Sequence, residues 1–258
     1  MMTKTLIVLA AALSAVACAS QPLLRLDDYM PMEAGRSLDY TIEETSTTRL
    51  PGQEPAESNL SSLQTESFRP ATAEETALLP AGASGAITKI SSRRPQNSEN
   101  AAETRAVMSR DQEALMLHAW LAPTGATEQY TPPLRILPVS FTTGTTWEMG
   151  TLRHQGMVFP TNAKIIGIED LKEGTSVFGD CLHVSYTTSR VEGEVATGQG
   201  MMQVSSGTTQ IDRWYARGTG LVKETATTVL VLQDASGESV ESSATRVQKI
   251  ASPAVDSP

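Results

Sequence analysis

Hydrophobic and polar residues alternate over short stretches along most of the chain, and Gly, Pro or Asn residues separate these stretches. Leu38, Tyr40 and Ile42 alternate with polar residues near the start, and the stretch from Leu182 to Tyr186 shows the same order. Because successive side chains of a β-strand point to opposite faces, each stretch predicts a strand with one apolar face. Regular short strands of this kind favour a β-sandwich or an open barrel over a fold that alternates strands with helices.

The other elements follow from the same pattern. Strands are predicted over residues 87–90, 145–153, 157–159, 163–170, 175–189, 199–205, 210–216, 221–232 and 246–250, the last as an edge strand. Residues 45–67 are rich in Ser, Thr, Pro, Glu and Gln, and they predict a weak strand followed by a mobile loop. Residues 71–79 predict a short helix or a turn, closed by Pro80 and Gly82.

The domain has a candidate boundary between two halves. Residues 123–138 contain several prolines and predict a crossing between the halves. The hexapeptides that begin at Gly35 and Gly144 are similar, Gly-Arg-Ser-Leu-Asp-Tyr and Gly-Thr-Thr-Trp-Glu-Met, and the second contains Trp147. An internal duplication is one interpretation of this short echo, and a chance likeness is the other.

A glycine corner lies between two predicted strands near the C-terminal end. Trp214 and Tyr215 end one strand, and Gly218 and Gly220 bracket a turn in which a positive φ is expected. The decapeptide from Trp214 to Lys223 resembles the Trp-Tyr-Ala-Pro-Gly-Val-Gly-Leu-Val-Lys signature of bacterial exported proteins of unknown function, the DUF3108-like group.

Two further motifs extend this resemblance. The segment from Gly174 to Cys181 is similar to the Gly-Thr-Phe-x-x-Cys strand of the group, and the segment from Pro31 to Tyr40 is similar to its opening motif. The chain departs from the pattern with Arg217 in place of proline, so the corner is expected to be less rigid. It also has Leu38 in place of tryptophan, so the first strand is expected to be less anchored.

The resemblance implies a mainly β fold, with a curved antiparallel sheet or open half-barrel and little helix apart from a signal peptide. Such a sheet is broadly similar to the half-barrels of periplasmic lipoprotein carriers, and the resemblance implies no reaction. In residues 104–121 helix propensity conflicts with strand alternation, and the resemblance favours a hairpin there.

Composition and charge limit the partners of this domain. The chain has 258 residues and a formal net charge of −9, and its acidic residues are dispersed. Phosphate backbones would be repelled and no basic stripe offsets the repulsion, so nucleic acid is not an expected partner. Only 5% of the residues are aromatic, so aliphatic side chains must build most of the core of a single β-rich domain at residues 31–250.

The N-terminus has the pattern of an export signal. A short basic region ends at Lys4, residues 6–13 are apolar but too few to span a bilayer, and Ala15-Val-Ala-Cys18 follows. This sequence resembles a bacterial lipobox with Ala15 in place of the preferred leucine, so we expect either lipidation of Cys18 or plain cleavage after Ala17 or Ala19.

Lipidation of Cys18 predicts a signal peptide at residues 1–17 and a tether at residues 18–30. The protein would then be an outer membrane lipoprotein that faces the periplasm, attached to the membrane through its lipid anchor. Plain cleavage predicts a soluble periplasmic or secreted protein. Residues 251–258 predict a disordered tail.

The chain has two cysteines, Cys18 and Cys181. A lipidated Cys18 cannot form a disulfide, and a lone thiol in an oxidising compartment is tolerable only when it is buried. We therefore expect Cys181 to be buried, and a disulfide between the two cysteines is the alternative.

The sequence contains no recognisable catalytic motif. The Gly-x-Ser-x-Gly elbow, His-Glu-x-x-His, the P-loop and Gly-x-Gly-x-x-Gly are all missing. Cys181 and His183 lie on one face of a strand, but a tetrahedral zinc site needs two more donors. We therefore expect no enzyme activity, no metal and no cofactor.

Methionine and tryptophan are the remaining candidates for a binding surface. The ten methionines, such as Met201 and Met202, either line an apolar groove or fill the core. Trp120, Trp147 and Trp214 lie in strand patterns and are expected to anchor the core.

The function favoured by these observations is that of a non-enzymatic envelope lipoprotein. The concave face of its sheet would bind a hydrophobic ligand or an envelope partner, which predicts a lined cavity. The alternative is a structural or assembly protein that interacts through an exposed sheet edge and has no cavity.

Overall fold

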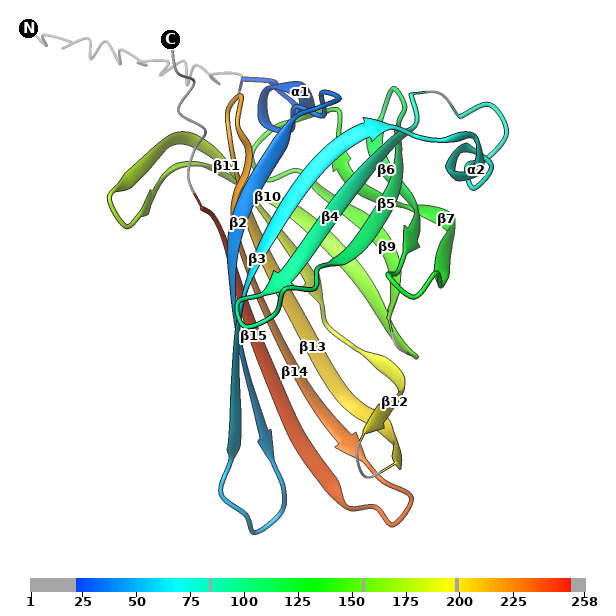
Figure 1. The fold of residues 1–258 in the computed structure, drawn as a ribbon, viewed down its shortest axis with the longest axis vertical. Helices are drawn as coiled ribbons and strands as arrows, with labels where there is room; N and C mark the ends of the chain where they lie inside the picture. Colours follow the sequence, from blue (N-terminus) through cyan, green and yellow to red (C-terminus); the bar gives the residue numbers. More distant parts are fainter. Residues whose placement is uncertain (1–21, 84, 155, 198–199, 252–258) are drawn as a thin grey trace, which may run out of the picture.

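One curved antiparallel sheet forms almost all of the protein (Figure 1). The computed structural model describes residues 22–83, 85–154, 156–197 and 200–251. Its elements are β1 (Leu24–Arg25), α1 (Leu26–Tyr29), β2 (Ser37–Arg49), β3 (Ala56–Pro70), α2 (Ala73–Thr76), β4 (Ile87–Pro95), β5 (Ala102–Arg110), β6 (Ala114–Leu121), β7 (Thr127–Pro138), β8 (Ser140–Phe141), β9 (Thr146–His154), β10 (Met157–Glu173), β11 (Ser176–Thr188), β12 (Glu192–Thr197), β13 (Gly200–Ala216), β14 (Gly220–Gln233) and β15 (Ser239–Ile250). The prediction of a mainly β fold with a curved antiparallel sheet and little helix is confirmed.

The order of the strands in the sheet follows the chain closely. Strands β2 to β7 form one meander, and β9, β10, β11, β13, β14 and β15 form a second, with β12 attached to β10 and β13. The last strand, β15, pairs with β2 from Glu241 and Arg49 to Ile250 and Tyr40. The first long strand and the last strand therefore lie side by side in the middle of the sheet.

The two outer strands of the sheet, β7 and β9, face each other. No backbone ladder joins them in the part of the chain that the structure describes, so the sheet is curved without being a closed barrel. The Trp147 indole on β9 donates a hydrogen bond to the Arg135 carbonyl on β7 (2.8 Å). Tyr186 on β11 donates another to the Ile136 carbonyl (3.0 Å). These bonds hold the two rims together and satisfy carbonyls that an open edge would leave unpaired.

The molecule is broad at one end and narrow at the other, because β13, β14, β15, β2 and β3 extend beyond the other strands (Figure 1). Within the narrow end, residues 56–61 of β3 are exposed. Among the described strands they pair with β2 alone, since the pairing of β3 with β4 starts at Ser62. This short stretch is an open sheet edge.

The main hydrophobic core lies inside the curve at the broad end. Its largest cluster joins side chains of β5–β7 to side chains of β9–β11. Leu115, Leu137, Ile165, Leu182 and Val184 in this cluster are fully buried. The alternation around Leu182 therefore marks a core face, as the sequence predicts.

Residues 22–30 belong to the folded domain. β1 pairs with β8, and Leu26 and Tyr29 of α1 are fully buried in the main cluster. Residues 22–30 of the segment predicted to be a tether are thus part of the fold. The predicted signal peptide, Cys18 and the predicted tail beyond residue 251 lie outside the described residues.

None of the helices in the described ranges is long and apolar enough to cross a membrane.

Two predictions for polar or proline-containing segments are wrong. Residues 45–67 form most of the β2–β3 hairpin, because their many Thr and Ser residues suit a strand that is paired on at least one side. Residues 127–138 form β7, so this segment is a strand of the first meander and does not cross between halves. Pro132 and Pro133 lie in an irregular part of β7, where neither has a register partner on β6, so their missing N–H groups break no ladder.

Several predicted strand ends are also wrong. The stretches 157–159 and 163–170 belong to β10, residues 200–205 and 210–216 belong to β13, and residue 199 lies outside the described residues. The residues between these stretches suggested that each strand is interrupted. A register shift in each strand accommodates the irregularity instead. The strand predicted at 246–250 begins at Ser239 and lies between β14 and β2, so it is no edge strand. Its polar side chains suggested an edge, but some of them face an internal cavity.

The two meanders open with equivalent turns. Gly35 and Gly144 have positive φ values of 86° and 85°. The Gly35 N–H donates to the Phe68 carbonyl on β3, and the Gly144 N–H donates to the Ile165 carbonyl on β10. Each turn is thus bonded to the second strand of its own meander. The meanders are joined by residues 139–145, after the predicted boundary, and an internal duplication stays a prediction.

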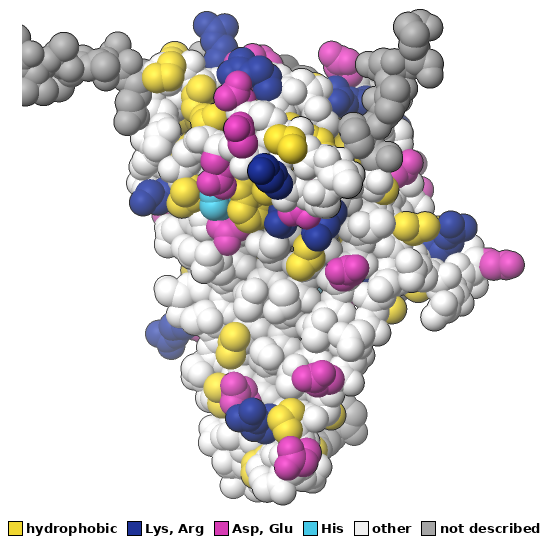
Figure 2. All heavy atoms as spheres, turned by 90° about the vertical axis from the view of Figure 1, so that its left-hand side faces the viewer, with side chains coloured by type: hydrophobic (Ala, Val, Ile, Leu, Met, Phe, Trp, Pro, Cys, Tyr) yellow, Lys and Arg dark blue, Asp and Glu magenta, His cyan; other side chains and the backbone are white. Residues whose placement is uncertain are grey.

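Charged side chains of both signs are interspersed on the side of the molecule shown in Figure 2. Neither sign forms a continuous surface in this view, and hydrophobic side chains appear as separate spots. This face offers no basic stripe to a phosphate backbone.

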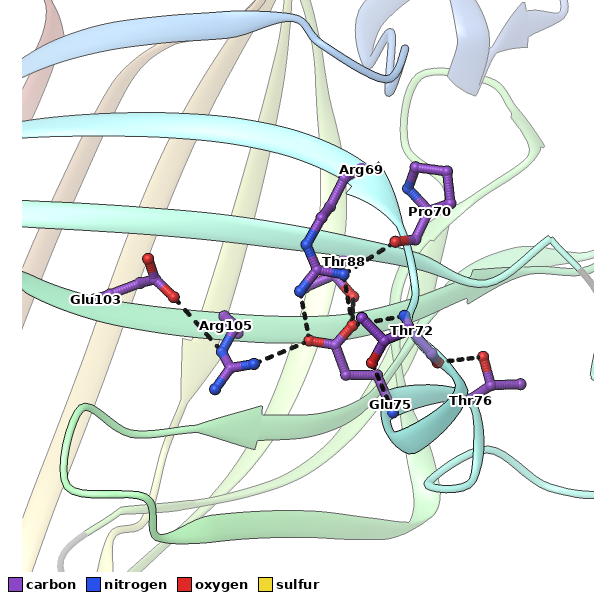
Figure 3. Close-up of polar contacts among 8 residues, drawn as sticks. All are labelled: Arg69, Pro70, Thr72, Glu75, Thr76, Thr88, Glu103 and Arg105. Carbon is purple, nitrogen blue, oxygen red and sulfur yellow. Dashed lines mark hydrogen bonds and ion pairs between the residues drawn. The ribbon is translucent and has the colours of Figure 1, made fainter.

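A buried carboxylate fixes the short helix α2 to the sheet (Figure 3). Glu75 is 2% exposed and accepts hydrogen bonds from Arg69 on β3 (2.7 Å to each oxygen) and from Thr88 on β4 (2.8 Å). Arg105 on β5 donates a further one (3.2 Å), and Thr72 completes a capping box. The hydrogen bonds from Arg69 outweigh the effect of burial and lower the pKa of Glu75 from 4.5 to about 2.

Glu75→Gln is expected to destabilise the protein by about 2 kcal/mol at neutral pH, because two arginines lose their carboxylate partner. The folded-state pKa lies below the unfolded value, so this stabilisation is present above pH 4.5 and is lost as the pH falls toward about 2. Urea unfolding at several pH values should show the difference from wild type shrinking across that window. Glu74→Gln, which changes the exposed neighbouring residue, is the control. A difference that does not vary with pH contradicts this account.

Candidate binding site

A cavity of about 300 Å³ lies inside the curve of the sheet. Its walls come from β2–β6 and from β13–β15, on both sides of the joint between the two meanders. The lining residues are Met30, Pro31, Leu38, Tyr40, Gln64, Glu66, Phe68, Lys89, Ser91, Arg93, Ala102, Thr104, Trp120, Arg213, Tyr215, Gly220, Leu221, Glu224, Arg246 and Gln248. Pockets for small molecules measure roughly 300–1,000 Å³, so this cavity suits a small ligand.

One part of the wall is apolar. Leu38, Phe68, Trp120 and Leu221 line it, together with Met30 from the segment that follows α1. The remainder of the wall is polar and charged, so the cavity is amphipathic.

Glu224 on β14 lies between two arginines from the neighbouring strands. Arg213 on β13 is its register partner and donates from Nε to Oε2 (2.7 Å), and Arg246 on β15 donates to Oε1. Burial pushes the pKa of Glu224 upward, but the two guanidinium groups outweigh burial and hold it at about 2. Glu224 is therefore ionised, and its single negative charge is shared by two positive ones.

Two further cations on the wall each have their own carboxylate. Lys89 Nζ lies 3.0 Å from Glu66, and Arg93 binds Glu44 with both terminal nitrogens (3.0 and 2.7 Å). With Arg213 and Arg246, four cations stand against the three carboxylates of Glu44, Glu66 and Glu224. The described residues around the cavity therefore carry one excess positive charge.

Gln248 on β15 extends the same polar row. It is the register partner of Glu224, it is 3% exposed, and it lines the cavity. Its Nε2 has no hydrogen-bond partner among the described residues. Leaving a buried donor unpaired costs roughly 1–3 kcal/mol, so this amide points to an acceptor from outside the protein.

The prediction of an apolar concave face holds only for part of the curve. Apolar side chains fill the space between β5–β7 and β9–β11, whereas charged side chains occupy the centre of the sheet at the cavity. Sequence reasoning missed Arg213, Glu224 and Arg246. The spacing of Arg246 and Gln248 places them on one strand face, but only the pairing of β14 with both neighbours brings them to Glu224.

The glycine corner holds the N-terminal segment at the cavity. Gly218 and Gly220 have the expected positive φ, 69° and 98°. The Gly218 N–H donates to the Asp28 carbonyl (2.7 Å). The Arg36 guanidinium donates to the carbonyls of Gly218 and Thr219 (2.8 and 2.7 Å). These bonds fix the segment that carries Met30 onto the cavity wall.

Arg217 strengthens this attachment from the position where the resemblance has proline. Its guanidinium pairs with Asp28 (3.3 Å) and donates to the Tyr29 hydroxyl (3.2 Å). It also lies 5.2 Å from the centre of the Tyr29 ring. The corner loses the rigidity of proline but gains side-chain contacts to α1.

The three tryptophans occupy different environments. Trp147 is 8% exposed in the main core, as expected of an anchor. Trp120 lines the cavity, whereas Trp214 stacks on His183 (4.4 Å between ring centres) away from it. The neighbouring Tyr215 is the aromatic residue of the corner that lines the cavity.

The methionines mainly fill the core. Met108, Met149, Met157 and Met202 are buried in hydrophobic clusters. Met201 is 59% exposed.

Cys181 is fully buried, which is the condition expected of a lone thiol, and burial raises its pKa to about 11.

The ring of His183 lies between two carboxylates, with Nδ1 3.0 Å from Glu169 and Nε2 3.2 Å from Asp212. Within the described ranges, no group of three or more His, Cys, Asp and Glu side chains could hold a metal ion. Cys18, and with it the alternative disulfide, lies outside these ranges.

Comparisons with known proteins add little to this picture. No protein-family model matches the chain, and no curated protein matches it. A solved structure described as "Lipid-protein interactions in lipovitellin" is similar, with 12% sequence identity and a TM-score of 0.43. The match covers 88% of this chain and 26% of the lipovitellin chain. A TM-score this low supports no conclusion about function.

Arg36→Ala is expected to loosen the N-terminal segment, because the two hydrogen bonds to the glycine corner are lost at a local cost of about 1–3 kcal/mol. Hydrogen–deuterium exchange should become faster in peptides that cover residues 26–35 and stay unchanged in β13. Arg190→Ala, at a side chain that is 78% exposed, is the control. Unchanged exchange at residues 26–35 would show that Arg36 does not hold this segment.

Proposed function

We propose that this protein is a non-enzymatic binding scaffold of the bacterial cell envelope, which holds a small amphiphilic ligand inside the curve of its sheet. The observation that supports this most directly is the cavity of about 300 Å³ with apolar and charged walls. Burial of the apolar part of a ligand contributes roughly 25 cal/mol per Å². A few fixed polar groups then determine its orientation.

The chemistry of the wall favours binding over catalysis. General acid–base catalysis needs a group that exchanges protons near neutral pH. The three histidines of the chain are absent from the lining of the cavity. Glu224 is held ionised by two arginines, so it does not serve as a general acid.

The N-terminal sequence supports a place at the membrane. The export signal and the lipobox-like sequence before Cys18 favour a lipid anchor in the outer membrane, with the domain in the periplasm. A soluble periplasmic or secreted protein is the alternative. The first strand residue, Leu24, follows Cys18 closely, so an anchor at Cys18 would keep α1 and the cavity near the membrane surface.

Assembly through a sheet edge is a second candidate function. Its support is the exposed stretch 56–61 of β3, which can accept a strand from a partner. The longer rim β7 is held against β9 by the side chain of Trp147 and against β11 by the side chain of Tyr186. The cavity favours the binding function, because assembly through an edge needs no cavity.

Ala102→Trp should abolish most ligand binding, because an indole at this position of the wall occupies the cavity. The uncharged fluorescent amphiphile N-phenyl-1-naphthylamine is a suitable probe, and we expect its affinity to fall by about tenfold or more. Glu103→Trp places the same ring on the opposite face of β5, where the side chain is 58% exposed, and should leave binding unchanged. Equal binding by both variants, or no binding by the wild type, would rule out the cavity as the site.

Mass spectrometry of the mature protein, purified from membranes of a bacterium that produces the full chain, should find an acylated Cys18. Cys18→Ser should move the protein from the membrane fraction to the soluble fraction, because the thioether to the lipid cannot form. A mature protein that begins at an unmodified Cys18 or at Ser20 would support plain cleavage instead.

A further inference from the structure

We propose that the ligand is a monoanionic amphiphile, with a carboxylate-type head group on an apolar body, and that Arg246 and Gln248 recognise the head group. This inference rests on the proposed binding function and adds the charge of the ligand to it.

The charges around the cavity are not balanced. Lys89 and Arg93 each have a carboxylate of their own, but Arg213 and Arg246 share Glu224. A charge without a counter-ion is costly away from bulk water. One negative charge from a ligand restores the balance at this point.

The group left unpaired in the cavity wall is a hydrogen-bond donor. Gln248 is nine-tenths buried or more, and the atom without a partner is its Nε2, which is a donor. Arg246 precedes it by two residues on β15, so both side chains lie on one strand face, and both line the cavity. The Arg246 side chain keeps 35% of its surface exposed, so it is still accessible after binding Glu224. Adjacent donors of this kind select a hydrogen-bond acceptor, and an anionic acceptor most strongly.

Glu224 and the apolar wall limit the charge and the body of the ligand. A dianion or a polyphosphate would place additional negative charge beside the ionised Glu224, so a single charge fits best. The side chains of Leu38, Phe68 and Leu221 on the remaining wall offer no partner to a polar group. They fit an apolar body such as a medium-length acyl chain, and the volume of about 300 Å³ leaves no room for a large one.

Displacement of bound N-phenyl-1-naphthylamine tests this inference at neutral pH, with competitors below their micellar concentrations. Decanoate should displace the probe at a concentration about tenfold or more below that needed for decanol, since a charged hydrogen bond is worth that factor. Acetate and inorganic phosphate should not displace it in the same range. Arg246→Gln and Gln248→Leu should each lower the preference for decanoate over decanol by about tenfold. Lys249→Gln, at the neighbouring residue that pairs with Glu173, should preserve the preference.

The outcomes separate this inference from the proposed function. Failure of the probe to bind would overturn both. Binding of the probe with equal displacement by decanoate and decanol would overturn the anionic head group alone. Displacement by acetate or phosphate as efficient as by decanoate would show a site for free anions and overturn the amphiphile. The comparison of decanoate with decanol uses the wild-type protein, so it decides the question even if Arg246→Gln does not fold.

Discussion

The pairing of β15 with β2 is the contact on which the rest of the structure depends. This ladder joins the two meanders into one sheet, whereas the opposite rims, β7 and β9, are held together by side chains. The cavity wall crosses the joint, from Arg213 and Glu224 on one side to Tyr40 and Lys89 on the other. Neither meander alone supplies both sides of the cavity.

The interior of the curve is divided between two kinds of chemistry. Where β5–β7 approach β9–β11, the space is dry and filled by aliphatic and aromatic side chains. At the centre of the sheet, the cavity lies between β2–β6 and β13–β15, and charged side chains line it. A buried ion pair adds little stability over an apolar pair of similar size. We therefore attribute the arrangement of Glu224 with two arginines to the proposed ligand more than to the stability of the fold.

The fold class could be predicted from the sequence because strand alternation is a local property. The apolar face around Leu182 and the turn at Gly218 and Gly220 depend on neighbours in the chain, and both have the expected geometry. Strand pairing could not be predicted, because it joins residues that are far apart. For this reason the sequence predicts an edge strand at residues 246–250 and a weak strand with a mobile loop at residues 45–67, whereas the structure has the central strand β15 and the β2–β3 hairpin. The candidate site depends on the same long-range pairing. Sequence reasoning therefore missed the charged residues of the cavity wall, although it found the glycine corner beside the cavity.

The position of the last strand has a consequence for the newly made chain. Because β15 supplies the ladder that joins β2 to the second meander, the central part of the sheet stays incomplete until the C-terminal residues have been synthesised. Arg246 and Gln248 arrive with the same strand. A truncated protein would therefore lack both the closing strand and the proposed head-group contacts, so binding of the proposed ligand would itself report that the whole polypeptide has folded.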